Sequence, residues 1–292
     1  MRFAADLYRG TAGHYDRYRL PYPEAMITDL VRTARISGRG RLLDLACGTG
    51  QLTFPLRQWF GEVWAVDSEP DMAEVVRVKA AAVGARDVRP IMSAAETLDA
   101  EPEYFELAVI GNAFHRLDRD LVAGRILGWL QPGGSLALCW SSGPWTGAED
   151  WQRALAANLD KWKAALGAQH RVPAGWDLAR RRRPDHQVLS DAGFEVDRRR
   201  EFTARHRWSL PDLAGYIRST SFLPATVLGD QADAFDADLA ASLGPYRDGD
   251  ALTETVSFAY DLARKPTRGR RAPRDGRADR SGIEKRGSES RN

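Results

Sequence analysis

The sequence predicts an α/β protein built on a doubly wound sheet of seven mostly parallel strands with a helical insert. Between residues 41 and 142, short apolar runs alternate with amphipathic segments, the order of a parallel sheet covered by helices. Between 143 and 183 the alternation gives way to a helical segment rich in tryptophan, and it resumes from 184. The 292 residues suffice for one large α/β domain with a subdomain.

Local signals place each element. The apolar run 41–46 is bounded by glycine, as is typical of a buried parallel strand. Pro55 stands near the first turn of the next helix, and the helix at 69–84 starts with acidic residues and stops at Gly84. Pro90 moves the third strand toward a sheet edge. Strands are expected at 41–46, 62–67, 87–95, 105–114, 135–142, 194–202 and 253–264. Helices are expected at 51–60, 69–84, 118–134, 185–193, 210–221 and 230–244.

Composition indicates a cytoplasmic protein. The first ten residues hold no apolar segment of a signal peptide, and no apolar run approaches the roughly 18 residues that cross a bilayer. Cys47 and Cys139 both fall in predicted strands, which favours reduced thiols over a disulfide framework. Residues 267–292 hold nine Lys/Arg and four Asp/Glu, which leaves 33 basic and 36 acidic residues before them. We therefore expect a mildly acidic body and a disordered basic tail.

The stretch RLLDLACGTGQL at 41–52 is a glycine-rich turn after the first strand. A phosphate-binding loop needs a lysine after its last glycine, and none follows Gly50. A dinucleotide fingerprint needs a third glycine where Thr53 stands. Asp44, at the strand's end, would repel a pyrophosphate and attract an ammonium group. A ligand with an α-amino group beside a nucleoside fits this turn, and a sulfonium amino acid linked to adenosine fits it best.

Asp67 ends the second strand, 17 residues after Gly50. An acid at this place can accept hydrogen bonds from two ribose hydroxyls. The alternative is that Asp67 caps the helix at 69–84.

Taken together, the stretches LLDLACGTG, AVDSEPDM, SAAETL and LQPGGSLAL resemble the class I S-adenosylmethionine-dependent methyltransferases over roughly residues 38–142. The stretches GHYDRYRLPYP, IGNAFHRLDR and GYIRSTSFLPATVLGD extend the similarity to about 8–266, toward a bacterial subgroup acting on small molecules of secondary metabolism. The resemblance implies a Rossmann-like fold, S-adenosylmethionine as cofactor and S-adenosylhomocysteine as product; no metal is expected, because the histidines lack metal-ligand spacing.

By this resemblance, the methionine part of the cofactor lies along the glycine-rich turn near Asp44, and Asp67 holds the ribose. Met72 packs on the adenine, Ala95 offers its N–H to the adenine edge with Glu96 beside it, and Asn112 lies below the sulfonium. The implied cofactor-binding residues are Tyr15, Arg19, Asp44, Ala46, Gly48, Gly50, Asp67, Ser68, Met72, Ala95, Glu96 and Asn112. Two positions depart from the family pattern: Ala46 replaces a glycine, and Ala94 replaces an Asp common in relatives.

The chain divides into five expected parts. These are an N-terminal lid segment (1–28), a cofactor-binding core (29–142), a helical cap or insert (143–183), the remainder of the core with substrate-side helices (184–266) and the basic tail (267–292). In the lid, Arg19 can pair bidentately with the cofactor carboxylate. The alternative for this segment is an aromatic helix docked on the sheet edge.

His115 follows the fourth strand and is the candidate general base and substrate contact, with Trp145 as a second substrate contact. The alternative for the tryptophans of the insert is that they form a small core of their own, namely Trp145, Trp151, Trp162 and Trp176. The structural alternative is that His115 caps the helix beginning near Asp118. Relatives often carry His-Trp here, whereas this chain has His115 followed by Arg116. The other histidines show no metal-ligand spacing.

We expect methyl transfer to N or O of a small-molecule acceptor, for example an amino sugar in antibiotic biosynthesis. The acids at 149, 150, 160 and 177 could receive such a cationic acceptor, but the pattern favours a solvated helix face for most of them. The basic tail and the RRRR run at 180–183 support a rival, an RNA methyltransferase, which the mildly acidic body disfavours. A third possibility is a protein that binds the cofactor without transferring methyl groups. No membrane partner is expected, and the chain is expected to be a monomer or a homodimer.

Overall fold

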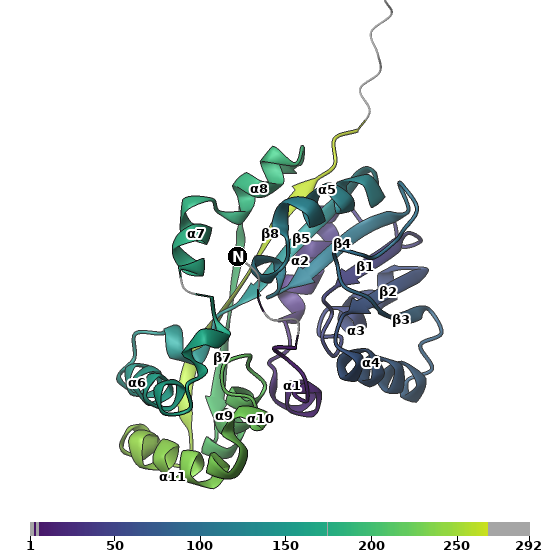
Figure 1. Cartoon of the computed structure of the whole chain (residues 1–292). Helices are drawn as coiled ribbons and strands as arrows, with labels where there is room; N and C mark the ends of the chain where they lie inside the picture. Colours follow the sequence, from purple (N-terminus) through teal and green to yellow (C-terminus); the bar gives the residue numbers. More distant parts are fainter. Residues whose placement is uncertain (1–2, 4–5, 174, 268–292) are drawn as a thin grey trace, which may run out of the picture.

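The computed structural model describes residues 3, 6–173 and 175–267, arranged around one twisted sheet (Figure 1). The strands are β1 Arg41–Leu45, β2 Glu62–Asp67, β3 Val88–Met92, β4 Phe105–Gly111, β5 Leu130–Ser141, β6 Glu195–Val196, β7 Arg200–Trp208 and β8 Leu252–Arg264. The helices are α1 Ala12–Tyr18, α2 Glu24–Ala34, α3 Thr53–Leu56, α4 Pro70–Ala82, α5 Arg119–Trp129, α6 Asp150–Ala165, α7 Trp176–Arg182, α8 Asp185–Asp191, α9 Leu210–Arg218, α10 Ala225–Leu228 and α11 Ala232–Leu243.

The sheet has the order β3-β2-β1-β4-β5-β8-β6, and β7 also pairs with β8. Strands β1 to β5 run parallel, whereas β8 runs antiparallel to β5, β6 and β7. Because β6 and β7 pair with successive parts of β8, they occupy one position in the sheet. The predicted Rossmann-like, mostly parallel arrangement of seven strand positions is therefore confirmed. The strand order reverses between β1 and β4, and ligands of doubly wound sheets bind in the crevice beyond the carboxyl ends at such a point.

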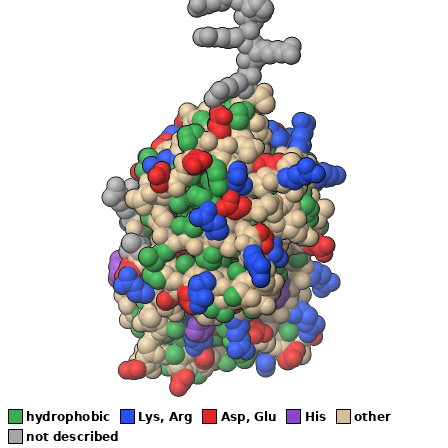
Figure 2. All heavy atoms as spheres, turned by 90° about the vertical axis from the view of Figure 1, so that its right-hand side faces the viewer, with side chains coloured by type: hydrophobic (Ala, Val, Ile, Leu, Met, Phe, Trp, Pro, Cys, Tyr) green, Lys and Arg blue, Asp and Glu red, His purple; other side chains and the backbone are tan. Residues whose placement is uncertain are grey.

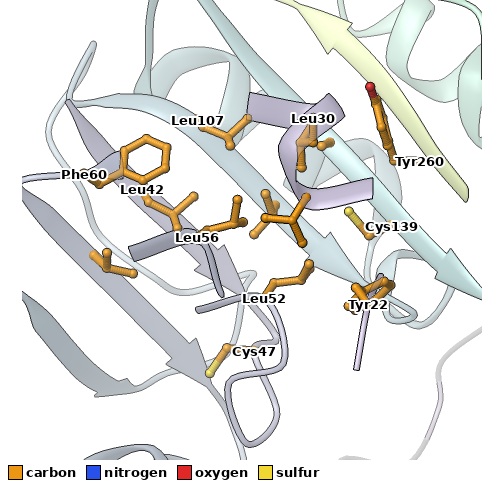
Figure 3. Packing of buried hydrophobic residues seen from close by; sticks show 14 of the residues in the cluster. Tyr22, Leu30, Leu42, Cys47, Leu52, Leu56, Phe60, Leu107, Cys139 and Tyr260 are labelled. Atoms are coloured by element: carbon orange, nitrogen blue, oxygen red, sulfur yellow. The ribbon is translucent and has the colours of Figure 1, made fainter. Parts of the chain in front are cut away.

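Apolar clusters cover both faces of the sheet. On one face Leu30 of α2 packs over Leu42 and Leu107, and all three side chains are fully buried (Figure 3). On the other face Phe105 and Val122 belong to a second cluster. Burial of each such side chain stabilises the fold by about 1.5–3 kcal/mol. The two clusters therefore hold in place the strands whose carboxyl ends form the site.

A third apolar cluster joins the insert to the later helices. Trp151 and Leu155 of α6 pack with Trp208 at the end of β7 and with Phe235 of α11. Helices α6, α9, α10 and α11 lie together at one end of the molecule, where β7 and β8 extend beyond the rest of the sheet (Figure 1). Residues 143–183 thus supply α6 to a core that they share with later residues, while α7 lies apart from it.

Several elements differ from their expected bounds. The helix expected at 51–60 is the short α3 followed by a 3₁₀ turn, Arg57–Trp59. The strand expected at 194–202 continues as β7 to Trp208, and its arginines conceal the alternation of half-buried and exposed positions. β5 begins at Leu130, inside the range 118–134 that was expected to be helical, and its pairing to β4 has an irregularity.

The structure bears on membrane-spanning helices but not on the C-terminal tail. Among the described residues, no helix is both long enough and apolar enough to cross a membrane. The expected disordered tail, apart from Thr267, lies outside the described residues.

Candidate functional site

A cleft of about 730 Å³ opens at the carboxyl ends of β1, β2 and β4. Its walls include the segment before α1, the turn after β4 and helix α7. The residues predicted from sequence that line it are Tyr15, Ala46, Gly48, Asp67, Ser68, Met72, Glu96, Asn112 and His115. A smaller cavity of about 30 Å³ shares Tyr15, Ala46 and Asn112 with the cleft and adds Arg19 and Asp44. The structure therefore brings most of the predicted site together.

The glycine-rich turn has a backbone that only small residues tolerate easily. Ala46, Gly48 and Gly50 have φ of 55°, 55° and 88°. A side chain at Gly48 would also meet the ring of Tyr15 at 3.1 Å, and one at Gly50 would meet Phe54 at 2.6 Å. Ala46 adopts a left-handed conformation that costs a non-glycine residue roughly 1–2 kcal/mol. Gly50 shapes the turn and does not line the cleft or the cavity.

Asp44 is a buried carboxylate with only half of its hydrogen-bonding capacity used. Its side chain is 1% exposed, and its Oδ2 accepts a 2.6 Å hydrogen bond from the hydroxyl of Thr53. Its Oδ1 is buried without a partner. Burial raises the pKa of Asp44 to about 7, against the lowering effect of Thr53. A buried oxygen without a hydrogen bond destabilises the folded protein by about 1–3 kcal/mol. A ligand that donates a hydrogen bond to this oxygen would therefore bind favourably.

Arg19 is a cation without an acidic partner among the described residues. Its Nε and Nη2 donate to the hydroxyl and carbonyl oxygens of Ser219, at 2.8 and 3.0 Å. Its guanidinium stands 4.7 Å from the ring centroid of Tyr15 and 4.9 Å from that of Tyr216. The small cavity thus carries an unpaired carboxylate oxygen on one wall and an unpaired cation on another.

Asp67 braces the glycine-rich turn from the end of β2. Its Oδ2 accepts from the N–H of Gly48 at 2.8 Å, and its Oδ1 accepts from the N–H of Glu69 at 2.9 Å. The side chain is 9% exposed and lines the cleft, and burial raises its pKa. Glu69 occupies the cap position of α4. Carboxylate oxygens accept more than one hydrogen bond, so Asp67 keeps capacity for ribose hydroxyls, and that role stays a prediction.

Asn112 lies where the cleft meets the small cavity. Its φ is 51°, and its side chain donates to Ser141 Oγ at 2.8 Å while accepting from the Ser141 N–H at 3.1 Å. These bonds hold the amide in one orientation. Ala95, in contrast, is buried in the apolar cluster of one sheet face, and its neighbour Ala94 lines the cleft.

His115 is a neutral hydrogen-bond donor in this geometry. Its Nε2 accepts from Arg116 Nε at 3.2 Å, so the ring hydrogen resides on Nδ1, which is buried without a partner. Burial, followed by the charges of Arg116, Arg180 and Arg119, lowers its pKa to about 2. Helix α5 is instead capped by Asp118, which accepts from the Leu121 N–H at 3.3 Å. The base role predicted for His115 remains untested, and this tautomer opposes it.

Two tryptophans of the insert have different places from those the sequence suggested. Trp145 packs against Tyr216 and Phe222, with centroids at 5.9 and 5.0 Å, and it does not line the cleft. Trp176 does line the cleft, 5.2 Å from the ring centroid of His115. Tyr8, Arg116 and Arg180 also line it. Arg116 was marked in the sequence as the departure from the His-Trp pair of relatives, and Arg180 as part of the RRRR run, but neither pattern predicted a place in this cleft.

Known proteins match the part of the chain that contains the glycine-rich turn, Asp67 and Asn112. Residues 42–134 match a family described as a methyltransferase domain. An uncharacterized methyltransferase of Mycobacterium tuberculosis is 30% identical over 135 residues, covering 46% of this chain and 52% of that protein. The ribosomal RNA small subunit methyltransferase G of Deinococcus deserti is 35% identical over 105 residues, covering 35% and 42%. The chain spans about half the length of the curated relatives it matches.

The fold extends the likeness beyond the matched region. A protein of solved structure from Anaeromyxobacter dehalogenans, named for a type II methyltransferase, has a TM-score of 0.56 and 21% identity to this chain. The match covers 86% of this chain and 99% of that one, which shows the shared fold. Residues 42–134 are therefore similar in sequence to a methyltransferase domain, and the described fold is shared with a protein named as a methyltransferase.

Proposed function

We propose that the chain binds S-adenosylmethionine and transfers its methyl group to nitrogen or oxygen of a small-molecule acceptor. The observation that carries this proposal is that Asp44 and Arg19, which do not contact each other, both line one small cavity. The amino-acid part of the cofactor carries an ammonium and a carboxylate. The ammonium would supply the donor that Asp44 Oδ1 lacks, and the carboxylate would supply the anion that Arg19 lacks.

The rest of the cofactor fits the adjoining cleft. Asp67, Met72 and Glu96 line the cleft in which the ribose and adenine are expected, and Asp67 contacts the glycine-rich turn through the Gly48 N–H. Asn112 lies at the junction, which is the place expected for the sulfonium. Methyl transfer is an in-line displacement, so the work of these residues is to orient the donor and to exclude water.

The dimensions of the cleft support a small-molecule acceptor. Its volume of about 730 Å³ lies within the range of roughly 300–1,000 Å³ typical of small-molecule sites. The acids considered for an amino sugar are elsewhere: Asp160 pairs with Lys163, Asp177 pairs with Arg181, and neither they nor Glu149 and Asp150 line the cleft. An amino sugar therefore has no support from these residues.

An RNA acceptor is the second candidate, favoured by the match to the ribosomal RNA methyltransferase of Deinococcus deserti. The RRRR run adds little support for RNA binding, because most of its positive charge is already paired with carboxylates within the protein. Arg180 pairs with Asp185, Arg181 with Asp177, and Arg183 with Asp120 and Asp191. On the face shown in Figure 2, Lys/Arg and Asp/Glu side chains are interspersed, without a continuous basic stripe.

The test combines binding with transfer. Calorimetry should show S-adenosylhomocysteine binding, and mass spectrometry with labelled S-adenosylmethionine should show a methylated product in a panel of small acceptors. Removing residues 268–292 should leave this activity intact. Binding without transfer to any acceptor would favour a non-transferring role, and transfer only to RNA that is lost with residues 268–292 would favour the second candidate. Absence of cofactor binding would contradict the proposal itself.

A further inference from the structure

The cleft is also lined by side chains that have no role in the proposed binding of the cofactor. We call Tyr8, His115, Arg116, Trp176 and Arg180 the acceptor pocket; all five line the cleft. They come from the segment before α1, from the turn after β4 and from α7. The segments are far apart in the sequence, and their side chains meet beyond the strand ends.

The acceptor pocket itself contains two arginines and no acid, although acids line other parts of the cleft, namely Asp67, Glu69, Glu96, Asp118 and Asp120. Arg119 and Arg180 share one carboxylate, Asp185, at 2.9 and 2.7 Å. Arg116 has no ion pair among the described residues; its Nε donates to His115 Nε2, and its guanidinium lies 4.6 Å from the ring centroid of Tyr8. A cationic group would be repelled by Arg116, and a neutral group would leave Arg116 without an anionic partner.

Aromatic rings form the walls. The ring centroid of Trp176 lies 5.2 Å from that of His115 and 6.2 Å from that of Phe3. The guanidinium of Arg180 is held over Trp140 at 4.4 Å from its ring centroid, which orients both groups. Planar ligands gain from stacking on such rings. His115 adds one directional group, because its buried Nδ1–H has no partner in the described part of the chain.

From these contacts we infer that the acceptor pocket binds a planar aromatic molecule carrying an anionic oxygen group, a carboxylate or a phenolate. Arg116 supplies the countercharge, Trp176 the stacking surface and His115 Nδ1 a hydrogen-bond donor. This inference rests on the proposed function and names the substrate class. An anionic acceptor also suits a sulfonium donor, because transfer between opposite charges loses both charges in a cleft that excludes water.

A matched set of arenes tests the inference. With S-adenosylhomocysteine bound, calorimetry compares naphthoate with its neutral amide and with the cationic naphthylmethylamine. Naphthoate should bind about tenfold more tightly than the amide, as expected for a charge-assisted hydrogen bond, and the amine should bind most weakly. R116Q should remove the preference for naphthoate over the amide, whereas R116K should keep it. The exposed, ion-paired Arg181 of α7, which does not line the cleft, gives the control R181Q, which should keep the preference.

Equal affinities for the three arenes, no binding of naphthoate, or an unchanged preference in R116Q would each overturn the inference. S-adenosylhomocysteine affinity, measured in the same samples, reports separately on the proposed function and on the integrity of each variant. If it persists in the wild type while the arene preference is absent, the acceptor class is wrong and the proposed function stands.

Discussion

The hydroxyl of Thr53 donates a 2.6 Å hydrogen bond to Oδ2 of Asp44, which lines the small cavity, and this contact leaves Oδ1 of Asp44 without a partner among the described residues. A residue that at first only marks the lack of a third glycine thus orients the acid at the centre of the site. Arg19 completes the arrangement from the N-terminal segment, on another wall of the same cavity.

Thr53→Val should weaken S-adenosylhomocysteine binding about tenfold, because Asp44 loses a hydrogen bond worth roughly 1.5–3 kcal/mol to its charged form. Valine has nearly the same shape, so the loss reports the hydroxyl. Thr53→Ser keeps the hydroxyl and should bind almost as the wild type does. Calorimetry measures both, and equal affinities for Val and Ser would refute the orienting role.

Cofactor binding should depend on pH through Asp44. Burial raises its pKa from the ordinary 3.8 to about 7 in the folded, ligand-free protein. The folded state therefore binds this proton more tightly than the unfolded chain, and this group's contribution to stability falls as pH rises from about 4 to 7. An ammonium pairs with the ionised form, so affinity should rise by about tenfold per pH unit below 7 and level off above it.

Calorimetry in buffers of different ionisation enthalpy should show release of about one proton per bound ligand near pH 6. Asp44→Asn should bind weakly at every pH and release no proton. A pH-independent affinity in the wild type would show that Asp44 does not pair with the ammonium.

Ala46→Gly should stabilise the protein by about 1 kcal/mol. The native φ of 55° strains alanine by roughly 1–2 kcal/mol, and the added flexibility of glycine in the unfolded chain offsets about 0.5–1 kcal/mol of the gain. Thermal unfolding should show a rise in Tm of about 2–4 °C. Gly48→Ala is the reverse experiment, since it adds a methyl group 3.1 Å from Tyr15 at φ 55°, and it should lower the Tm. A lower Tm for Ala46→Gly would contradict the strain.

His115 should act as a donor and not as a titrating base. Asparagine can place an N–H near the position of Nδ1, whereas glutamine places its amide near Nε2. His115→Asn should therefore retain more activity than His115→Gln. The pKa of His115 is lowered to about 2. The pH profile of kcat/KM should therefore have the same shape near pH 6.5 in the wild type and in His115→Asn. An inflection near pH 6.5 that His115→Asn abolishes, or a better-preserved Gln variant, would restore the base role.

The sequence predicted those parts of the site that depend on strand ends. Asp44, Asp67 and Asn112 each lie at or just after the end of a parallel strand, and such ends meet at one edge of the sheet. The ligand type followed from Asp44 and the absence of a glycine at Thr53, so the cofactor side could be inferred from local pattern.

The acceptor side depends on long-range packing, which no local pattern carries. Trp145 and Trp176 both belong to the aromatic insert, but the first packs on α9 through Tyr216 and the second faces the cleft. Trp208 ends a strand whose arginines hide its alternation. Tyr8 enters the cleft only because the segment before α1 folds over the strand ends.

The most direct test of the account pairs ligand changes with protein changes in calorimetry. S-adenosylhomocysteine is compared with its decarboxylated and deaminated analogues, in the wild type, Arg19→Gln and Asp44→Asn. Removing the carboxylate should weaken binding about tenfold or more in the wild type and in Asp44→Asn, and hardly at all in Arg19→Gln. Removing the amino group should weaken binding in the wild type and in Arg19→Gln, and hardly at all in Asp44→Asn. If each analogue loses the same affinity in all three proteins, Arg19 and Asp44 do not hold the two ends of the amino acid, and the account is wrong.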